Sequence, residues 1–388
     1  MAKRFSDDRT LQPSFFDDVI KEVVGFSDLD DRQFHQELSN IVTRKLFGSG
    51  TTQPERLRLI REIYNRTRGL DILQPLLDDP SVTEIMVNGP NHVFYEKDGV
   101  IHQAEIVFDN MRHLFDVVST LFSRLNRPLS LHNPIADARL KDGSRANAAI
   151  PPVAPDGPVL TLRKFTGVRH TPEALIETGF LTTESLVFLQ KQVRERRSVF
   201  ICGGTGTGKT TLLNVLSSFI PDHERIVTIE DSIELQLVNQ PNLVRLEARL
   251  PGPDGEGEIT ISQLIRASLR MRPDRIIVGE VRGREAADLI QAMNTGHPGS
   301  LCTGHGNSCR DMIVRLSNLV LDGSTMPLEA VRQTLASVID IMVHISRVAG
   351  GRRKVDEICA VESGADGQPQ IKLLYAPREG DGELVSLV

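Results

Sequence analysis

The sequence has no tryptophan, only four cysteines among 388 residues, and no long hydrophobic run. A helix that crosses a bilayer needs about 20 mostly apolar residues in a row, so no transmembrane segment is expected. The cysteines form no C-x-x-C pair, which argues against a structural zinc site. The N-terminus lacks the apolar core of a signal peptide. Since there is no disulfide pattern either, we expect a reducing, cytoplasmic setting.

The sequence also has no excess of basic residues, because 45 Lys and Arg face 51 Asp and Glu, for a formal net charge of −6. Nucleic-acid-binding domains usually carry a basic excess, so no direct nucleic-acid partner is expected. The hydrophobic content of 40% and charged content of 25% are typical of a soluble globular protein. A chain of this length favours two domains, with room for an extension.

The chain divides into three segments with different sequence patterns. Residues 1–66 carry charged helical patterns and predict a helical extension. Residues 67–167 contain short strands around two Asp-Gly turns, which predicts a small α+β domain. In residues 168–388 short apolar strands alternate with helices, which predicts an α/β fold with a mostly parallel sheet covered on both faces. The expected hinge is 167–171.

A glycine-rich segment fits the phosphate-binding pattern G-x-x-x-x-G-K-[ST] between an apparent buried strand, 198–202, and an apolar helix that begins at 211. Glycines let backbone N–H groups close around phosphate oxygens. Lys209 would neutralise the β- and γ-phosphates, and Thr210 would offer its hydroxyl to Mg²⁺. A glycine-rich turn without a ligand is the alternative, but it does not explain the Lys and Thr. The expected nucleotide contacts are Gly203, Gly204, Thr205, Gly206, Thr207, Gly208, Lys209, Thr210 and Thr211.

Acidic residues follow two later strands. Glu230 and Glu234 lie in the segment Thr228-Ile229-Glu230-Asp231-Ser232-Ile233-Glu234, and Glu280 follows Gly279 at the end of another apolar run. Carboxylates at the ends of parallel strands lie beside the phosphate loop, where Glu230 could contact the nucleotide and another acid could activate a water for hydrolysis. A solvated acidic loop is the alternative. The guanine-reading N-K-x-D motif is absent, so ATP is favoured over GTP.

Two histidines, His297 and His305, lie in a Gly- and Thr-rich segment downstream of both acidic clusters. Lone histidines are usually ordinary core or surface groups, but this placement favours polar sensors near the γ-phosphate. Zinc binding is the weaker alternative, because four ligands at the usual spacings are missing.

The smaller domain contributes Arg139, Arg145 and Arg163 on or beside its last strands. Strand arginines are commonly surface groups. An NTPase, however, needs guanidinium groups to stabilise charge on the transferring phosphoryl group. Arginines on a separate domain would couple the nucleotide state to domain closure.

Together these motifs carry a family resemblance. Four segments in this order resemble the type II/type IV secretion ATPase superfamily: 203–210, 228–234, 279–282 and 295–305. Three segments of the smaller domain are similar to the CpaF-type branch, which drives Tad/Flp pili and related filaments: 82–90, 142–152 and 162–165. The resemblance covers roughly residues 70–360 and departs at 303–307, where glycines flank His305.

The resemblance implies a RecA-like P-loop domain with a PAS-like α+β domain before it, ATP between the two, and a homo-hexameric ring. Glu234 would be the catalytic base, Glu280 would support Mg²⁺ and water, and Arg145 and Arg163 would reach the γ-phosphate. ATP and Mg²⁺ are the implied cofactors. The implied partner is an inner-membrane platform protein, with the ring at the cytoplasmic face of that membrane, where it would extend or also retract a pilus.

Three other functions stay open. A type IV secretion ATPase would use the same chemistry to move protein or DNA substrates. A nucleic-acid motor could use the same core, although the acidic charge balance speaks against it. A nucleotide-sensing subunit without hydrolysis would not need both Glu234 and Glu280.

Overall fold

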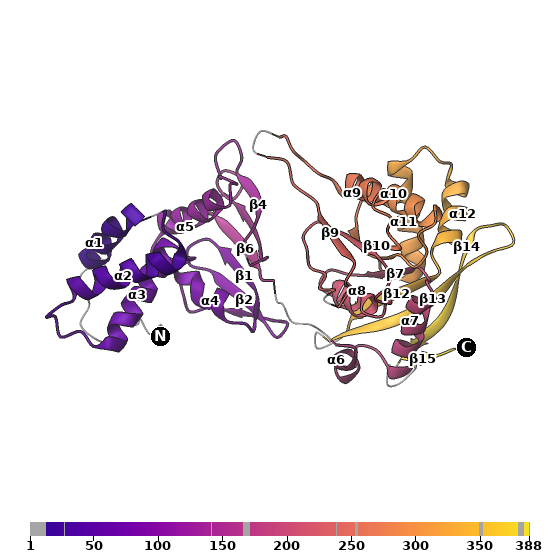
Figure 1. Cartoon of the computed structure of the whole chain (residues 1–388), viewed down its shortest axis with the longest axis horizontal. Helices are drawn as coiled ribbons and strands as arrows, with labels where there is room; N and C mark the ends of the chain where they lie inside the picture. The colour runs from indigo at the N-terminus through magenta and orange to yellow at the C-terminus, as the bar shows by residue number, and fades with distance from the viewer. Residues whose placement is uncertain are drawn as a thin grey trace. The chain divides into compact units, whose positions relative to one another are not determined.

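The chain forms two compact units in the computed structural model, Met1–Thr166 and Gly167–Val388, here called the N-terminal and the C-terminal unit (Figure 1). The structure describes residues 13–26, 28–140, 142–165, 171–237, 239–252, 255–348, 352–378 and 384–387. The predicted hinge lies outside these residues except for Thr171, which caps helix α6 (Pro172–Glu177). Within the described ranges, no helix combines the length and apolar character that crossing a bilayer requires.

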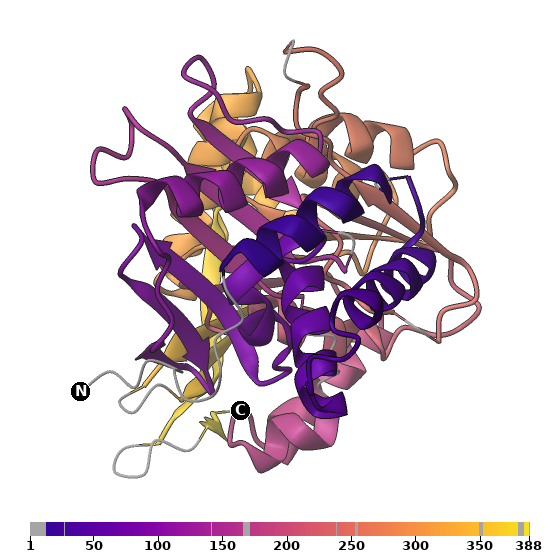
Figure 2. The ribbon, with the colours of Figure 1, turned by 90° about the vertical axis from the view of Figure 1, so that its left-hand side faces the viewer.

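Three helices open the N-terminal unit: α1 (Pro13–Val23), followed by the short η1 (Val24–Phe26), then α2 (Asp31–Lys45) and α3 (Gln53–Thr67). They pack on one another, as Figure 2 shows in indigo, around a separate apolar cluster that includes Leu38 and Ile63. Local caps fix where they begin, because the Asp30 side chain accepts from Gln33 N and a capping box starts α3. Helical structure in this part of the chain matches the sequence pattern.

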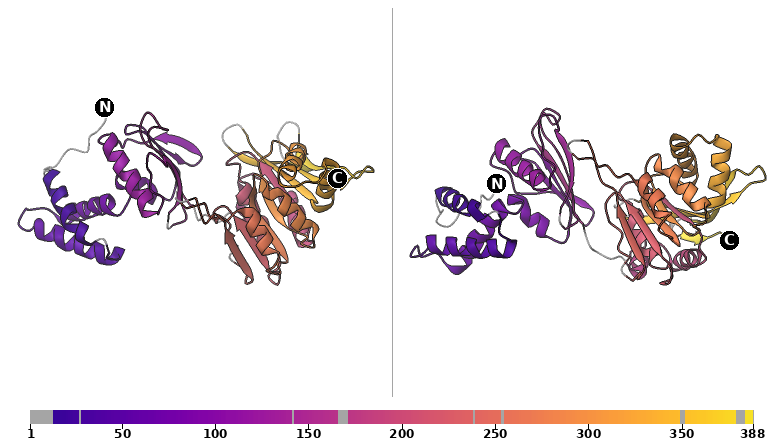
Figure 3. Two further views of the ribbon diagram at one scale, coloured as in Figure 1. Left: turned by 90° about the horizontal axis from the view of Figure 1, so that it is seen from above. Right: turned by 45° about the horizontal axis from the view of Figure 1, so that its top comes forward.

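An antiparallel sheet makes up the rest of the N-terminal unit. Its elements are η2 (Asp71–Leu73), α4 (Gln74–Asp78), β1 (Val82–Asn88), β2 (Val93–Lys97), β3 (Val100–Gln103), α5 (Met111–Arg124), β4 (Ile135–Arg139), β5 (Arg145–Ala149) and β6 (Val159–Arg163). The strand order is β3-β2-β1-β6-β5-β4. Helix α5 lies along one face (Figure 3), because Leu114, Val118 and Phe122 are fully buried against the sheet. The other face therefore carries the polar strand residues.

A nine-stranded sheet forms the centre of the C-terminal unit, in the order β15-β14-β13-β12-β7-β11-β10-β8-β9. The pairs from β9 to β12 are parallel, and those from β12 to β15 are antiparallel. After α6, its elements are α7 (Thr183–Arg194), β7 (Val199–Gly203), α8 (Lys209–Ser217), β8 (Ile226–Glu230), β9 (Leu243–Glu247), α9 (Ile261–Ser268), β10 (Arg275–Val281), α10 (Glu285–Asn294), β11 (Leu301–Gly304), α11 (Cys309–Gly323), α12 (Leu328–Val338), β12 (Ile341–Arg347), β13 (Arg353–Ser363), β14 (Pro369–Pro377) and β15 (Leu384–Ser386).

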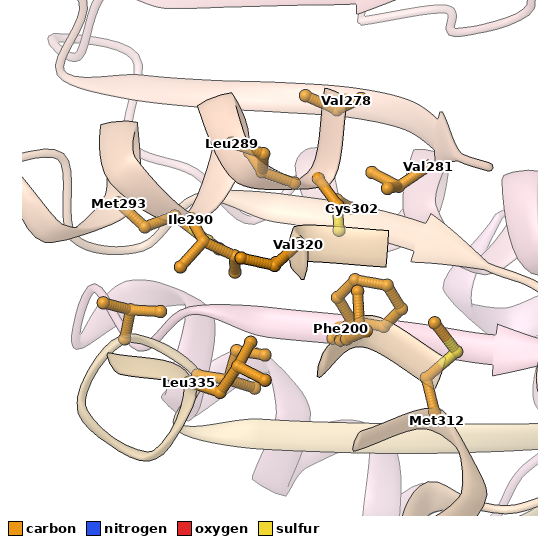
Figure 4. Packing of buried hydrophobic residues seen from close by; sticks show 14 of the residues in the cluster. Phe200, Val278, Val281, Leu289, Ile290, Met293, Cys302, Met312, Val320 and Leu335 are labelled. Atoms are coloured by element: carbon orange, nitrogen blue, oxygen red, sulfur yellow. The ribbon is translucent and has the colours of Figure 1, made fainter. Parts of the chain in front are cut away.

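Helices cover both faces of this sheet, so the α/β prediction is confirmed. Successive strand residues point to opposite faces: Val199 faces the layer of α6, α7 and α8, and Phe200 faces that of α9 to α12. Figure 4 shows the second layer, where Phe200 and Cys302 pack with Met312 and Val320 of α11. The sequence reading did not include β9 or the antiparallel edge formed by β13, β14 and β15.

Candidate active site

The phosphate loop joins β7 to α8, as its sequence predicts. Gly206 and Gly208 have left-handed backbone angles, with φ of 67° and 102°. Gly208 is the N-cap of α8, and as a glycine it offers the first amides of the helix no side-chain cap. A Cβ at Gly203 would lie only 2.4 Å from the Ile345 carbonyl oxygen. This loop fits a polyphosphate, because helix N-termini and open loop amides favour anions.

Lys209 points back into this loop. Its side chain is 8% exposed, and its Nζ donates to Gly204 O at 2.9 Å and Gly203 O at 3.2 Å. The same Nζ lies 3.8 Å from Glu280 Oε1 at the end of β10. The structure thus brings together the predicted phosphate lysine and the predicted acid.

Four threonines of the loop take different positions. Thr205 is exposed, whereas the Thr207 hydroxyl is buried and donates to Gly204 O at 3.0 Å, so Thr207 stabilises the loop itself. Thr210 and Thr211 are half-buried in the first turn of α8. Thr210 directly follows the phosphate lysine, which is the position of the hydroxyl that binds Mg²⁺ in phosphate loops.

Glu280 is the centre of a charged cluster. Its Oε2 accepts from Arg282 Nε at 2.8 Å and Nη2 at 2.6 Å, and its Oε1 lies 2.7 Å from His305 Nε2. Burial and the positive charge of Lys209 lower the pKa of His305, against the opposing effect of Glu280, so the imidazole is neutral at pH 7. A neutral ring with its hydrogen on Nε2 can donate to Glu280 Oε1. Its unprotonated Nδ1 then faces Lys209 Nζ at 3.4 Å.

The glycines that flank His305 have a packing reason. A Cβ at Gly304 would lie 3.0 Å from both Phe200 and Met312, and one at Gly306 would lie 3.0 Å from Met312 Sδ. Glycine at both positions lets the backbone lie against the core and presents His305 at the end of β11. The departure from the family pattern at 303–307 thus leaves His305 beside the phosphate loop.

The acidic segment after β8 has one buried and one more accessible carboxylate. Glu230 is 3% exposed, and its Oε2 accepts from the backbone N–H groups of Glu234 at 2.8 Å and Leu235 at 3.0 Å. Burial raises the pKa of Glu230 from 4.5 to about 7, against the opposing effect of those two N–H groups. Glu234 is half-buried in the loop.

His297 does not join this cluster within the chain, and its expected contact with the γ-phosphate needs correction. It lies before β11, whose first residue, Leu301, pairs with Val199 at the start of β7. His305 follows the other end of the same strand, where Gly304 pairs with Cys202 beside the phosphate loop. His297 Nδ1 instead lies 3.0 Å from Ala292 O, so the ring caps a carbonyl in the last turn of helix α10.

The three predicted arginines form one row in the N-terminal unit. Arg139 pairs with Arg145 across β4 and β5, and Arg145 pairs with Arg163 across β5 and β6. Directly paired residues of an antiparallel sheet share a face, and like charges placed opposite each other are unfavourable. Glu84 on β1 pairs with Arg163 and adds an opposite charge to this row, which is here called the arginine row.

Two arginines beside the phosphate loop were missed by the sequence reading. Arg347 Nη2 donates to Gly206 O at 3.4 Å, and Arg353 is its partner across the β12–β13 pair. The signal that could have found them is the basic segment at 352–354, which follows a strand adjacent to β7. Predicting β12 as a strand would have been the necessary first step.

The cysteines are closer together than their spacing indicates. All four are free and buried, and hydrogen bonds with the Cys202 and Cys359 thiols raise the pKa of Cys309. Ligand atoms of Cys309, Cys359 and Glu357 lie within 4.8 Å of one another. A search of the sequence for C-x-x-C could not find this group, because Cys309 lies in α11 whereas Glu357 and Cys359 lie in β13. As neutral thiols they pack like small apolar groups.

Comparisons with known proteins agree with this arrangement. A family model described as "Type II/IV secretion system protein" matches residues 66–365. A protein of Mycobacterium tuberculosis H37Rv named "Putative conjugal transfer protein Rv3659c" is 35% identical over 332 residues, which cover 84% of this chain and 94% of that protein. The type IV secretion system protein VirB11 of Brucella suis is 33% identical over 303 residues, covering 71% of this chain and 84% of that one.

Two solved structures have a similar fold. The pilus retraction motor PilT with bound ADP matches with a TM-score of 0.54 at 21% identity, over 77% of this chain and 84% of that one. The ATPase DotB of Legionella pneumophila matches with a TM-score of 0.53 at 19% identity, over 72% and 76%. At these identities the likeness supports the fold alone.

Proposed function

Since the chain belongs to the type II/IV secretion system protein family, we propose that it is an ATP-hydrolysing motor that uses Mg²⁺. The observation that carries the proposal is the cluster at the carboxyl ends of β7, β10 and β11. There the ammonium of Lys209 lies inside a phosphate loop, 3.8 Å from Glu280 and 3.4 Å from a neutral His305. This combination of loop, cation, carboxylate and imidazole suits phosphoryl transfer.

The chemistry of each residue follows from its charge and position. Bound Mg²⁺ supplies positive charge on the phosphate oxygens, and the Thr210 hydroxyl and Glu280 are suited to hold it. Lys209 would exchange the Gly203 and Gly204 carbonyls for phosphate oxygens, which are better acceptors for an ammonium. Glu234 would take the proton of the attacking water, since it is more accessible than Glu230 and is the last acid of the segment that resembles the family motif.

We assign the arginine row to stabilising negative charge on the transferring phosphoryl group. Its guanidinium groups are always charged, and they are suited to bidentate contacts with phosphate oxygens. The residues with this role are Arg145 and Arg163, with Arg139 beside them.

For the cellular task we propose assembly of a Tad/Flp-type pilus by a hexamer at the cytoplasmic face of the inner membrane, through a platform protein. The support is the similarity of residues 82–90, 142–152 and 162–165 to the CpaF-type branch. A second candidate is transport by a type IV secretion system. It is favoured by the names of the mycobacterial relative and of VirB11.

Deleting the gene separates these tasks when pili are counted by electron microscopy and protein or DNA transfer is measured in the same strain. The pilus proposal predicts loss of pili, recovery with the wild-type gene and no recovery with Lys209→Ala. Intact pili with lost transfer would favour the secretion role. Intact pili with intact transfer would contradict both.

A further inference from the structure

We propose that Glu230 is a positioning residue, whose buried carboxylate fixes the backbone of residues 231–235 and thereby orients Glu234. The inference rests on the proposed ATP hydrolysis with Glu234 as the base. It changes the role expected from the sequence, in which Glu230 contacts the nucleotide directly.

The first support is the hydrogen bonding of the loop. Glu230 Oε2 accepts from Glu234 N at 2.8 Å and from Leu235 N at 3.0 Å, so a single oxygen holds two consecutive amides. One of these amides belongs to the proposed base itself. Two hydrogen bonds from consecutive N–H groups to one buried oxygen fix the orientation of the peptide planes beside Glu234.

The second support is the room made for this carboxylate by the neighbouring strand. A Cβ at Gly279 would lie 3.0 Å from Glu230 Cγ and 3.6 Å from its Oε2. Strands β8 and β10 are adjacent and parallel, and Ile229 pairs with Val278 one residue earlier. The glycine before Glu280 therefore leaves room for the Glu230 side chain, which explains the glycine at this position of β10.

The third support is the unfavourable environment that Glu230 tolerates. Its side chain is 3% exposed, and its Oε1 is buried without a hydrogen-bond partner among the described residues. Burying a polar atom without a partner is costly, and a leucine would avoid that cost. The two amides that it holds therefore explain why a carboxylate occupies this position, whereas the stability of the fold alone would favour a leucine.

The test compares two substitutions of Glu230 in the full-length protein by kcat and by Kd for a non-hydrolysable ATP analogue. Glu230→Leu removes the acceptor, and displacing a reacting group by about 1 Å can lower the rate about 100-fold, so we expect a fall of that order in kcat. The Kd should change by less than about threefold, because the nucleotide contacts are elsewhere. Glu230→Gln keeps one carbonyl oxygen for both amides and should restore kcat to within about tenfold of wild type.

A double-mutant cycle gives an independent readout. Gly279→Ala should lower kcat in the wild-type background, because its Cβ displaces Glu230. In the Glu230→Ala background Cγ is missing, so the same change should have little further effect. Glu329→Gln is the control, because Glu329 is exposed in the first turn of α12. It should leave kcat within about twofold.

Each other outcome overturns the inference. Unchanged kcat in Glu230→Leu would mean that the loop needs no such support. Equal losses of kcat and analogue affinity would make Glu230 a nucleotide ligand. A Glu230→Gln variant as slow as Glu230→Leu would make it a catalytic acid or base. If the wild type does not hydrolyse ATP, the proposed function fails first, and the two failures are distinguishable.

Discussion

Arg275 offers a sharp test of how the C-terminal unit is held together. Its guanidinium is fully buried and donates to Glu224 through Nε at 2.7 Å and Nη2 at 2.9 Å, while Nη1 donates to Val193 O at 2.7 Å. Arg275→Met would leave the Glu224 carboxylate, 4% exposed, without its main partner. Breaking one side of a buried pair costs about 3–5 kcal/mol. Arg196 Nη2 remains 3.6 Å from Glu224, so we expect about 3 kcal/mol.

Calorimetry is the suitable assay, because the chain has no tryptophan to report unfolding. The transition of the C-terminal unit can be identified by its shift with an ATP analogue. Arg266→Met is the matched control: Arg266 pairs with Asp288 at 2.8 Å but is 71% exposed, so its loss should cost far less than that of Arg275. Adding Glu224→Gln to Arg275→Met should recover part of the loss. Equal costs for the Arg275 and Arg266 variants would refute the reasoning.

Three further predictions concern the site. Because the pKa of Glu230 is about 7 when folded and 4.5 when unfolded, the wild type should lose up to about 3 kcal/mol relative to Glu230→Gln as the pH rises from 4.5 to 7; parallel unfolding curves would contradict this. Lys209→Ala should weaken binding of an ATP analogue at least about tenfold in calorimetric titration, since a phosphate charge loses its partner, and unchanged affinity would remove Lys209 from the site. Arg163→Ala should lower the ATPase rate strongly and change ADP affinity little; an unchanged rate would exclude this arginine from catalysis.

The phosphate loop was predictable because its function depends on local sequence. The pattern from Gly203 to Thr210 requires a strand before it and a helix after it, and β7 and α8 have those positions. The positions of Glu230 and Glu280 were predictable for a related reason, since each lies at the carboxyl end of a short apolar strand of a parallel sheet.

The two histidines mark the limit of that reasoning. His297 and His305 lie in one Gly- and Thr-rich segment, and composition does not distinguish them. Strand β11 passes between them, so only one can lie at the carboxyl edge of the sheet. The apolar segment 300–303 already indicates this strand in the sequence, and drawing the consequence of its parallel direction would have been enough to choose His305.

Long-range pairing accounts for most of what the sequence did not reveal. The Asp-Gly turn at 142–143 predicts that Arg139 and Arg145 are neighbours, but the pairing of Arg145 with Arg163 depends on strand order. The antiparallel strands β13 and β14 carry charged residues among their apolar ones, which weakens the alternation that identifies a strand.

Steady-state ATP hydrolysis by wild type and Glu234→Gln, measured beside analogue binding, tests the central claim most directly. The account predicts Mg²⁺-dependent hydrolysis by the wild type. The Glu234→Gln variant should bind the analogue with similar affinity and hydrolyse ATP at least about 100-fold more slowly, because the amide keeps the shape of the side chain and loses the base. Near wild-type turnover by Glu234→Gln would contradict the account and move the role of base to Glu230 or Glu280.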